Sequence, residues 1–367
     1  MPTPHFNRRR FLQAMGASTA LLSSSWASHA FGKPPRKIGV ALLGLGGYSS
    51  GQLAPGLQLT QYCELRGIVT GSPEKVPVWQ EKYGIKDANV YNYENLHTIA
   101  DNPDIDVVYV VTPTSLHKKF SVIAANAGKH VWCEKPMAMD EAECQEIIDA
   151  CTKNKVKLSI GYRMQHEPNT QTVMRFAKEK PFGAIEKVES IAAYSGGENR
   201  SPDNWRMQRE MGGGALYDMG VYPINGSRYA MGIEPVAVSG RHEVTHPEVF
   251  TQVDSTTHFQ LEFPNGATAD CMTSFVKPGN KLDVTCEDGW YYLRPMSNYT
   301  GVQGKTSDGR LLNKPIADQQ AQQMDDDALA ILQDKPVMVP GEEGLRDIHI
   351  VQSIFKSASE NGKRIEL

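Results

Sequence analysis

The stretch that most constrains the fold is an apolar run at residues 38–43, which is followed directly by Gly44, Gly46 and Gly47. A short unbroken apolar run predicts a buried strand, and glycines directly after it allow a tight turn and a close approach of the backbone to a ligand. Such a turn, leading into the N-terminus of a helix, is typical of a dinucleotide site. Ser49 stands where the fingerprint has its third glycine, so an ordinary strand-to-helix connection is the alternative interpretation.

Strand and helix patterns alternate up to about residue 160. Apolar runs predict further buried strands at residues 64–69, 107–111, 130–133 and 158–160. Helical periodicity predicts a helix at residues 117–127 that ends at Gly128, and the capping-box spacing of Asp140 and Glu143 predicts the start of another. Repeated strand-helix units with buried strands predict an α/β fold with a parallel, doubly wound sheet of the Rossmann type.

The second half of the chain has a different pattern. Longer alternating runs predict strands at residues 185–194, 236–244, 257–263 and 267–275, and Asn265-Gly266 predicts a hairpin turn between the last two. Helices are predicted at residues 319–333 and 343–359. We therefore expect a Rossmann domain at residues 31–160 and, at residues 161–367, an α+β domain with a large, mostly antiparallel open sheet.

A targeting segment is predicted at residues 1–30. The arginines at residues 8–10 precede Phe11-Leu12 and an apolar stretch at residues 14–22, and Ser28-His29-Ala30 fits a cleavage site. The stretch is too short to span a bilayer, and a mobile basic tail is the alternative. The arginine pattern resembles a twin-arginine (Tat) signal, whose export machinery carries folded proteins to the periplasm. A cofactor loaded before export would have to be held tightly, because the periplasm has no pool of it.

Composition excludes several classes of function. The chain has 367 residues, of which 40% are hydrophobic and 22% charged, and a net charge of -4, a balance typical of a globular enzyme or binding protein. Lys and Arg cluster only at the N-terminus, so no nucleic acid partner is expected. The six cysteines show no metal-ligand spacing, so no metal site is predicted, and Cys144 and Cys151 fit small core residues on an apolar helix face.

The end of the second predicted strand carries Thr70, Gly71 and Ser72. An NAD site usually has Asp or Glu here, about 20 residues after the glycine turn, to bind the ribose hydroxyls. In this chain the residues are neutral and Lys75 follows, which suits a 2'-phosphate and predicts NADP. A plain turn with an exposed lysine is the alternative interpretation.

Two polar stretches follow the third and fourth predicted strands. They are Thr112-Pro113-Thr114-Ser115-Leu116-His117 and Glu134-Lys135-Pro136. Ligands bind at the carboxyl edge of an open parallel sheet, which is where both stretches are expected. At that edge Lys135 could lower the pKa of a neighbouring group or bond a substrate hydroxyl, whereas a solvated surface lysine is the alternative.

A second group of candidate residues lies in the later half of the chain. Trp205-Arg206 precedes a glycine-rich loop at residues 212–214, which leads to Asp218 and Tyr222. Their i,i+4 spacing places them on one face of a predicted helix. A phenol has an unperturbed pKa of about 10, so it needs a cation such as Lys135 nearby to act as a base around neutral pH. A structural tyrosine bonded to a buried aspartate is the alternative.

These motifs together resemble a known family. Gly44-x-Gly46, Glu134-Lys135-Pro136, Gly161-Tyr162-Arg163 and the glycine-rich loop before Asp218 are similar to the glucose-fructose oxidoreductase, inositol dehydrogenase and rhizopine-catabolism (Gfo/Idh/MocA) superfamily over essentially the whole mature chain. The twin-arginine pattern, Thr-Gly-Ser-Pro-Glu-Lys at residues 70–75 and the Asp218-x-x-x-Tyr222 spacing most resemble its glucose-fructose oxidoreductase branch.

The resemblance implies a two-domain enzyme that holds NADP tightly and exchanges hydride in two steps. An aldose such as glucose would reduce the cofactor and leave as the lactone, and a second sugar, fructose or an aldose, would take the hydride and become an alditol. Tyr222 would be the general acid/base, Lys135 would lower its pKa and bond the substrate, and Asp218 would orient the sugar hydroxyls beside Arg163. The cofactor would be lined by Gly44, Gly46, Gly47, Tyr48, Ser49, Thr70, Gly71, Ser72, Lys75, Tyr93, Thr112, Pro113, Thr114, Leu116, His117, Glu134, Lys135, Arg163, Trp205, Arg206 and Tyr299. A homodimer or homotetramer is also implied.

Three other functions stay open on the sequence. An NAD-dependent glycoside hydrolase of the same fold would convert glycosides to free sugars without net redox change. An aldose dehydrogenase with exchangeable NADP would not retain its cofactor between turnovers. A non-catalytic sugar-binding protein is disfavoured, because both Lys135 and Tyr222 are present.

Overall fold

The computed structural model of the chain describes residues 36–367, so the predicted signal peptide at residues 1–30 lies outside the described residues. The first sheet has the strand order β3-β2-β1-β4-β5-β6, and every pairing in it is parallel. Its strands are β1 (Ile38–Leu43), β2 (Cys63–Val69), β3 (Val90–Tyr91), β4 (Val107–Val110), β5 (His130–Cys133) and β6 (Leu158–Ile160). The strand order reverses between β1 and β4, which is where open sheets of this kind bind ligands. The predicted Rossmann-type sheet is confirmed.

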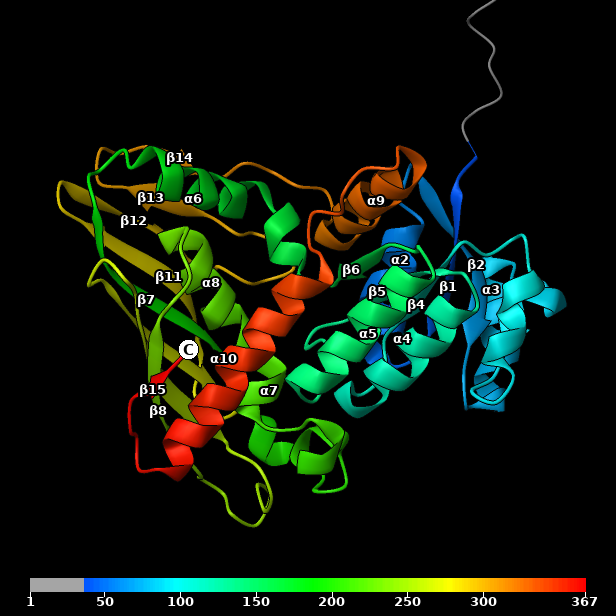
Figure 1. The fold of residues 1–367 in the computed structure, drawn as a ribbon, viewed down its shortest axis with the longest axis horizontal. Helices are drawn as coiled ribbons and strands as arrows, with labels where there is room; N and C mark the ends of the chain where they lie inside the picture. Colours follow the sequence, from blue (N-terminus) through cyan, green and yellow to red (C-terminus); the bar gives the residue numbers. More distant parts are fainter. Residues whose placement is uncertain (1–35) are drawn as a thin grey trace, which may run out of the picture. The chain divides into compact units, whose positions relative to one another are not determined.

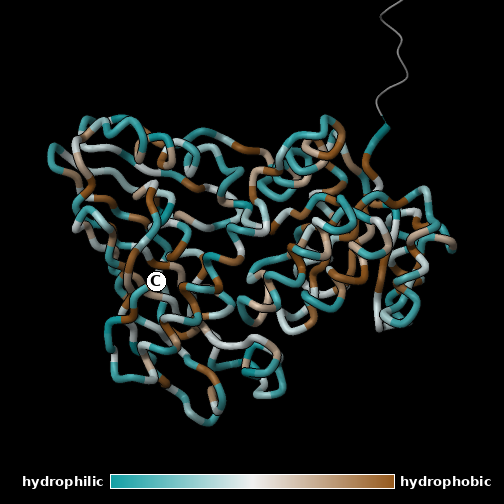
Figure 2. The backbone as a smooth tube through the Cα atoms, in the orientation of Figure 1, coloured by the Kyte–Doolittle hydropathy of each residue, from teal (hydrophilic) through white to brown (hydrophobic). Residues whose placement is uncertain are grey.

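Helices cover both faces of this sheet, which explains its unbroken apolar strands. All residues of β1 and β4 are buried, and Figure 2 shows apolar segments gathered along these strands. One face packs against α4 (His117–Asn126) and α5 (Glu141–Lys153), and the other against α2 (Ala54–Leu57) and α3 (Val76–Tyr83). Asp140 caps α5 as predicted, since its Oδ1 accepts from the Glu143 amide at 2.8 Å.

The second sheet has nine strands in the order β14-β13-β12-β11-β7-β10-β9-β8-β15. They are β7 (Ile185–Ala193), β8 (Ala237–Glu243), β9 (Thr256–Glu262), β10 (Thr268–Ser274), β11 (Gly279–Cys286), β12 (Gly289–Leu293), β13 (Gly304–Thr306), β14 (Leu311–Leu312) and β15 (Ile365–Glu366). Only the β7–β10 pair is parallel, so the predicted, mostly antiparallel sheet is confirmed. The hairpin turn between β9 and β10 forms at Gly266, where φ is +84°.

Helices α6 (Pro168–Glu179), α8 (Val221–Met231) and α10 (Gly341–Ser359) lie along one face of the second sheet (Figure 1). Along β9 the burial of side chains alternates, as expected for a sheet with one face packed on a core. The other face of this sheet carries no helix of the described chain in Figure 1. The sheet is therefore open on one side.

Helix α9 (Gln319–Leu332) comes late in the chain but packs on the first sheet. Its Met324 and Ala328 belong to the same buried cluster as Val40 of β1 and Leu57 of α2. The carboxylate of Asp325 accepts from the Tyr62 amide at 2.8 Å. Helix α9 is thus a physical bridge between the two halves of the sequence.

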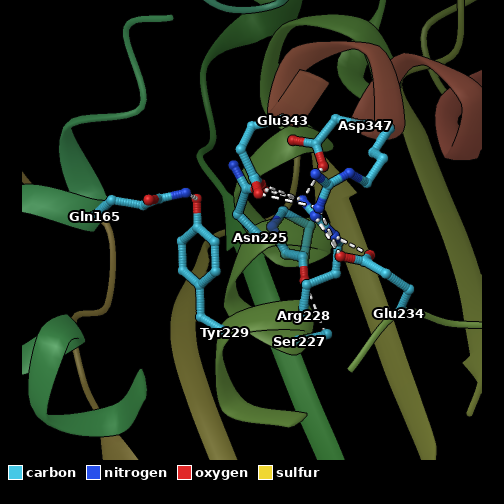
Figure 3. A network of polar contacts seen from close by, with 10 residues as sticks. Gln165, Asn225, Ser227, Arg228, Tyr229, Glu234, Glu343 and Asp347 are labelled. Atoms are coloured by element: carbon cyan, nitrogen blue, oxygen red, sulfur yellow. Dashed lines mark hydrogen bonds and ion pairs between the residues drawn. The ribbon is translucent and has the colours of Figure 1, made fainter. Parts of the chain in front are cut away.

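Arg228 of α8 is the centre of a buried ion-pair network that joins α8 to α10 (Figure 3). Its guanidinium binds Glu234 at 2.6 Å, Asp347 Oδ1 at 2.8 Å and Glu343 Oε2 at 3.0 Å. Burial raises the pKa of Asp347 to about 7, although Arg228 acts in the opposite direction. The network fixes α10 against α8 by charge as well as by packing.

Two further expectations concern the described residues. All six cysteines are buried, and none of them forms a disulfide within residues 36–367, which confirms that Cys144 and Cys151 are core residues rather than a disulfide. Within residues 36–367, every helix is too short or too polar to cross a bilayer.

Candidate active site

The glycine turn after β1 is shaped for a ligand. Gly44 has φ of +97°, and a Cβ there would lie 2.5 Å from the Val111 carbonyl oxygen, so only glycine fits. Above Gly46 and Gly47, by contrast, no atom of the described chain lies within 4 Å of an added Cβ, which leaves the backbone accessible to a ligand. Ser49 is buried, and its hydroxyl donates to the Gly44 carbonyl. A serine hydroxyl thus braces the turn at the place of the third glycine.

The carboxyl end of β2 lies beside this turn. Lys75 Nζ donates to the Leu45 carbonyl at 3.1 Å, which places an ammonium group against the glycine turn. The Ser72 amide donates to Thr70 Oγ1 at 3.0 Å. A Cβ at Gly71 would lie 2.7 Å from the Tyr93 ring, so these predicted cofactor residues lie close together. The two hydroxyls and the ammonium group fit an anionic part of a dinucleotide.

The loops after β4 and β5 are tied together by His117. Its Nε2 lies 2.8 Å from the Thr112 carbonyl oxygen and its Nδ1 lies 2.8 Å from that of Pro136. Burial lowers the pKa of His117, although both carbonyls act in the opposite direction. Each ring nitrogen thus lies at hydrogen-bond distance from a backbone carbonyl, a neutral imidazole donates to one of the two, and His117 lies between the two loops. Among residues 36–367, Thr112 Oγ1 is one of the buried polar atoms without a partner, so it is available to a ligand.

The second domain closes over this edge through its glycine-rich loop. A Cβ at Gly212 would lie 2.6 Å from Thr114 Cβ, so the loop and the β4 loop are in direct contact. Leu116 is half-buried beside them, and Pro113 precedes the 3-10 turn Thr114–Leu116. The bare turn, the free Thr112 hydroxyl and Lys75 together fit a dinucleotide cofactor at the carboxyl edge of the sheet.

Lys135, Asp218 and Arg206 form an ion-pair cluster. Lys135 Nζ lies 2.7 Å from the Asp218 carbonyl oxygen and 3.5 Å from its Oδ1, and Arg206 Nε lies 2.9 Å from its Oδ2. Burial acts to raise the pKa of Asp218, but Lys135 and Arg206 outweigh it and lower the pKa to about 2. The pKa of Lys135 is raised, because Tyr222, Asp218 and Glu134 outweigh its burial. Both charges therefore persist at neutral pH.

Tyr222 faces this cluster across a break in the helix. The predicted single helix is two, α7 (Ala215–Met219) and α8, because Gly220 ends the first and begins the second. Gly220 keeps helical angles of φ -62° and ψ -27°, so Asp218 and Tyr222 still share one face. Lys135 Nζ lies 5.0 Å and Arg163 Cζ 5.5 Å from the Tyr222 ring centroid. Two cations therefore flank the phenol.

Arg163 is buried among aromatic rings. Its Cζ lies 4.6 Å from the Tyr299 ring centroid, and the Tyr48 and Tyr299 centroids are 6.0 Å apart. Its Nη1 donates to the Asn298 carbonyl at 3.2 Å and to Gln319 Oε1. Burial raises the pKa of Tyr48 and raises that of Tyr299 to about 12. Both phenols are therefore neutral hydrogen-bonding groups.

The Glu-Lys-Pro and Gly-Tyr-Arg motifs meet at Glu134. A Cβ at Gly161 would lie 2.7 Å from Glu134 Oε1, so the carboxyl group occupies the space that glycine leaves. Tyr109 Oη donates to the same oxygen at 2.7 Å, and the Lys135 amide donates to Oε2 at 3.2 Å. Burial raises the pKa of Glu134, with these donors acting in the opposite direction.

Trp205 and Arg206 are predicted to line the cofactor, and this stays a prediction. In the structure Arg206 stacks on Trp205 with its Cζ 4.3 Å from the ring, and it binds Asp218. Sequence reasoning missed Tyr109 and three glutamines of α9. The only sequence signal for the three glutamines was a run of polar residues in a predicted helix. The missed residues are Tyr109, Gln319, Gln320 and Gln323.

A Rossmann sheet whose carboxyl edge meets a phenol, an ammonium group and a carboxylate defines the class of two-domain, nicotinamide-dependent oxidoreductases. Residues 38–162 match the family model of the oxidoreductase family with NAD-binding Rossmann fold, and residues 170–292 match that of the GFO/IDH/MocA C-terminal domain. The chain belongs to the GFO/IDH/MocA family, as its motifs predict.

Three relatives show the range of this family. The crystal structure of aldose-aldose oxidoreductase from Caulobacter crescentus, complexed with glycerol, is 35% identical, covers 90% of this chain and 100% of that chain, and has a TM-score of 0.86. D-xylose 1-dehydrogenase (NADP(+)) from Haloarcula marismortui is 28% identical over 345 residues, 89% of this chain and 92% of the relative. D-glucoside 3-dehydrogenase from Escherichia coli is 26% identical over 358 residues, 89% of this chain and 97% of the relative.

Proposed function

We propose that this chain is an NADP-dependent sugar oxidoreductase of the aldose-aldose or glucose-fructose type. An aldose such as glucose would be oxidised to its lactone, and a second sugar, fructose or an aldose, would be reduced to the alditol. The observation that carries the proposal is the cluster in which Lys135 and Arg163 flank the Tyr222 ring at 5.0 and 5.5 Å while Asp218 is held ionised beside them. The relative named aldose-aldose oxidoreductase supports the same substrate class.

The chemistry follows from the charges. The nicotinamide, when bound, supplies hydride acceptance and donation. Tyr222 takes the proton of the anomeric hydroxyl as hydride leaves the carbon, and it returns the proton to the carbonyl oxygen of the second sugar. The positive charges of Lys135 and Arg163 stabilise the phenolate that exists before the first step and again after the second. Asp218, which can only accept hydrogen bonds while ionised, orients neighbouring sugar hydroxyls.

NADP is the proposed cofactor because Thr70, Ser72 and Lys75 offer donors directly after β2, where an NAD site usually has Asp or Glu. A relative named for NADP(+) is consistent with this choice. A 2'-phosphate carries negative charge, which an ammonium group attracts and a carboxylate would repel. The selectivity of the site would therefore lie chiefly in Lys75.

Tight retention and ping-pong exchange are the less direct parts of the proposal. The twin-arginine pattern at residues 8–10 supports export of a folded, loaded protein to the periplasm by the Tat machinery.

The second candidate function is an aldose dehydrogenase with exchangeable NADP, which the xylose dehydrogenase relative favours. A glycoside hydrolase with bound nicotinamide is the third, since one relative is named for a D-glucoside. The open face of the nine-stranded sheet is the proposed contact for a homodimer or homotetramer.

One experiment separates these candidates. The protein is purified without added cofactor, passed through a desalting column, and its reduced-nicotinamide absorption band is recorded before and after addition of single aldoses. We expect the band to rise with a donor sugar and to bleach with an acceptor, without added NADP. A band that appears only with added NADP would favour the dehydrogenase, and release of free sugar from a glycoside would favour the hydrolase. A protein that is inert towards all sugars after reconstitution would refute the proposed function.

A further inference from the structure

Helix α9 presents three buried glutamines to the candidate site. The exposed fractions of Gln319, Gln320 and Gln323 are 0%, 1% and 2%. A buried amide without partners costs free energy, so such residues are retained in a helix only where they are paired. Gln319 binds Arg163 and the Asn298 carbonyl, and Gln320 Nε2 lies 3.5 Å from the Tyr48 hydroxyl. The glutamines therefore contact site residues rather than solvent.

Gln323 determines the direction of a chain of hydrogen bonds. Its Nε2 lies 3.1 Å from Tyr109 Oη, and an amide nitrogen can only donate. The Tyr109 oxygen is therefore the acceptor in that bond, and its single proton is free for another acceptor. Glu134 Oε1 lies 2.7 Å from Tyr109 Oη and receives that proton as a hydrogen bond. Gln323, Tyr109 and Glu134 thus form one directed chain that ends on a carboxylate.

The hydrogen bond from Tyr109 matters for the charge of Glu134 because Glu134 is buried. Burial raises the pKa of Glu134, whereas the Tyr109 hydroxyl, Lys135 and Arg163 act to lower it. The titratable groups that face the carboxyl group are Tyr109, Lys135, Arg163, Tyr48, Tyr299 and Cys133. Of these, only Tyr109 donates a side-chain hydrogen bond to it in residues 36–367. Loss of the hydrogen bond from Tyr109 would therefore raise the pKa of Glu134 further, because burial would be less opposed.

We propose that Gln323 is a positioning residue which, through Tyr109, holds Glu134 as an ionised acceptor for a hydroxyl group of the bound nicotinamide cofactor. The inference rests on the nicotinamide-binding part of the proposed function and is independent of which sugars react. A carboxylate accepts hydrogen bonds at both oxygens, and protonation replaces one of these acceptors with a donor. Release of the cofactor should accordingly accelerate when acid protonates Glu134.

Substitutions at the two ends of the chain test this directly. In Gln323→Glu a second carboxylate competes for the Tyr109 proton, and in Tyr109→Phe the proton is absent while the ring remains. Both changes raise the proton affinity of Glu134, so acceleration of cofactor release should begin at a higher pH than in the unaltered protein. Gln323→Met, which removes the donor without adding charge, should produce a smaller displacement in the same direction.

The measurement is the rate at which bound reduced cofactor leaves, followed by its fluorescence after mixing with excess NADP, from about pH 6 to about pH 9. We expect Gln323→Glu to release cofactor about tenfold faster at the pH where release from the unaltered protein begins to accelerate, and to approach the unaltered rate at the alkaline end of this range. The matched control is Gln322→Glu, since Gln322 is the exposed neighbour and donates to Asp326 at 2.9 Å. That variant should keep the unaltered profile.

The outcomes separate the proposals. A loss of retention that is equal in Gln323→Met and Gln323→Glu and independent of pH would mark Gln323 as a packing residue and overturn the inference. An unchanged profile in Tyr109→Phe would also overturn it, and that variant decides the matter if Gln323→Glu does not fold. Normal pH-dependent release from a protein that never reacts with sugars would instead refute the proposed function and leave this inference standing.

Discussion

Arg206 Nε lies 2.9 Å from Oδ2 of Asp218, the carboxylate oxygen that does not face Lys135. The carboxylate is thus shared between an ammonium group from the first domain and a guanidinium from the second. Because the pKa of Asp218 is lowered to about 2 by these two cations against the effect of its burial, Asp218 stays ionised over the working pH range. The contact of Lys135 with Asp218 links the two domains through the group proposed to orient the substrate.

Arg206→Gln should impair sugar binding and alter the pH profile. A hydrogen bond to a charged group contributes about 1.5 to 3 kcal/mol, so kcat/KM for the sugar should fall by about tenfold to 100-fold. The pKa of Asp218 should rise, and activity should then be lost at a higher pH than normal as the solution is acidified. Steady-state rates across pH check this. Arg209→Gln is the control, because Arg209 binds the Gln252 carbonyl instead, and an unshifted acid limb in Arg206→Gln would contradict the role of the pair.

Tyr222→Phe should greatly slow hydride transfer and leave cofactor retention unchanged. General acid-base catalysis contributes about 100-fold to 10,000-fold, so single-turnover reduction of the cofactor by an aldose should slow by that range. The ring remains to contact Lys135 and Arg163, so the fold should be preserved. Stopped-flow absorbance measures the step. Tyr292→Phe, on β12 of the second sheet, should react normally, and a normal rate in Tyr222→Phe would remove it from its assigned role.

Lys75→Ala should weaken the binding of NADP more than the binding of NAD. The ammonium group lies against the glycine turn and would pair with a 2'-phosphate, an interaction of about 1.5 to 3 kcal/mol. The affinity for NADP should therefore fall by about tenfold to 100-fold, with little change for NAD. Titration of both cofactors into stripped protein checks the difference. The exposed Lys82→Ala on α3 is the matched control, and equal losses for both cofactors would disprove the phosphate contact.

Arg228→Met should strongly destabilise the fold. The change leaves Glu234, Glu343 and Asp347 without their shared buried cation, and breaking such a pair costs about 3 to 5 kcal/mol. Urea unfolding measures the change in the free energy of unfolding. Adding Asp347→Asn should recover part of the loss, because one uncompensated carboxylate is then removed. Arg364→Met, at an exposed ion pair with Glu262, should change stability far less.

The strands that sequence analysis found are those with a strong local signal. The strand β1 reads as one unbroken apolar run because both of its faces are buried, and β9 alternates because only one face is. The strand β3 has only two residues, Val90 and Tyr91, and β14 has Leu311 and Leu312. Such short strands exist through pairing with a neighbour, so no local pattern reveals them.

The residues of the candidate site also fall into those with a local sequence signal and those without one. Gly44 was predictable, because its left-handed angle and the nearby Val111 carbonyl exclude a side chain. Lys135 and Tyr222 were predictable from their motifs. Arg206 is predicted to line the cofactor, and its ion pair with Asp218 was not predicted, because a loop residue carries no local pattern that reveals such a partner. Gln323 was overlooked, because a glutamine in a helix normally faces solvent.

The linear order of residues determined the two kinds of sheet, the glycine turn and the family of this protein, since burial period and turn chemistry act between neighbours in the chain. Tertiary structure alone decided that α9 returns to the first sheet and that Gln323 reaches Tyr109, which lies 214 positions earlier in the chain. It also decided that Asp218 is shared by Lys135 and Arg206. Contacts between distant residues arise from the packing of whole elements, and no local pattern of side chains encodes them.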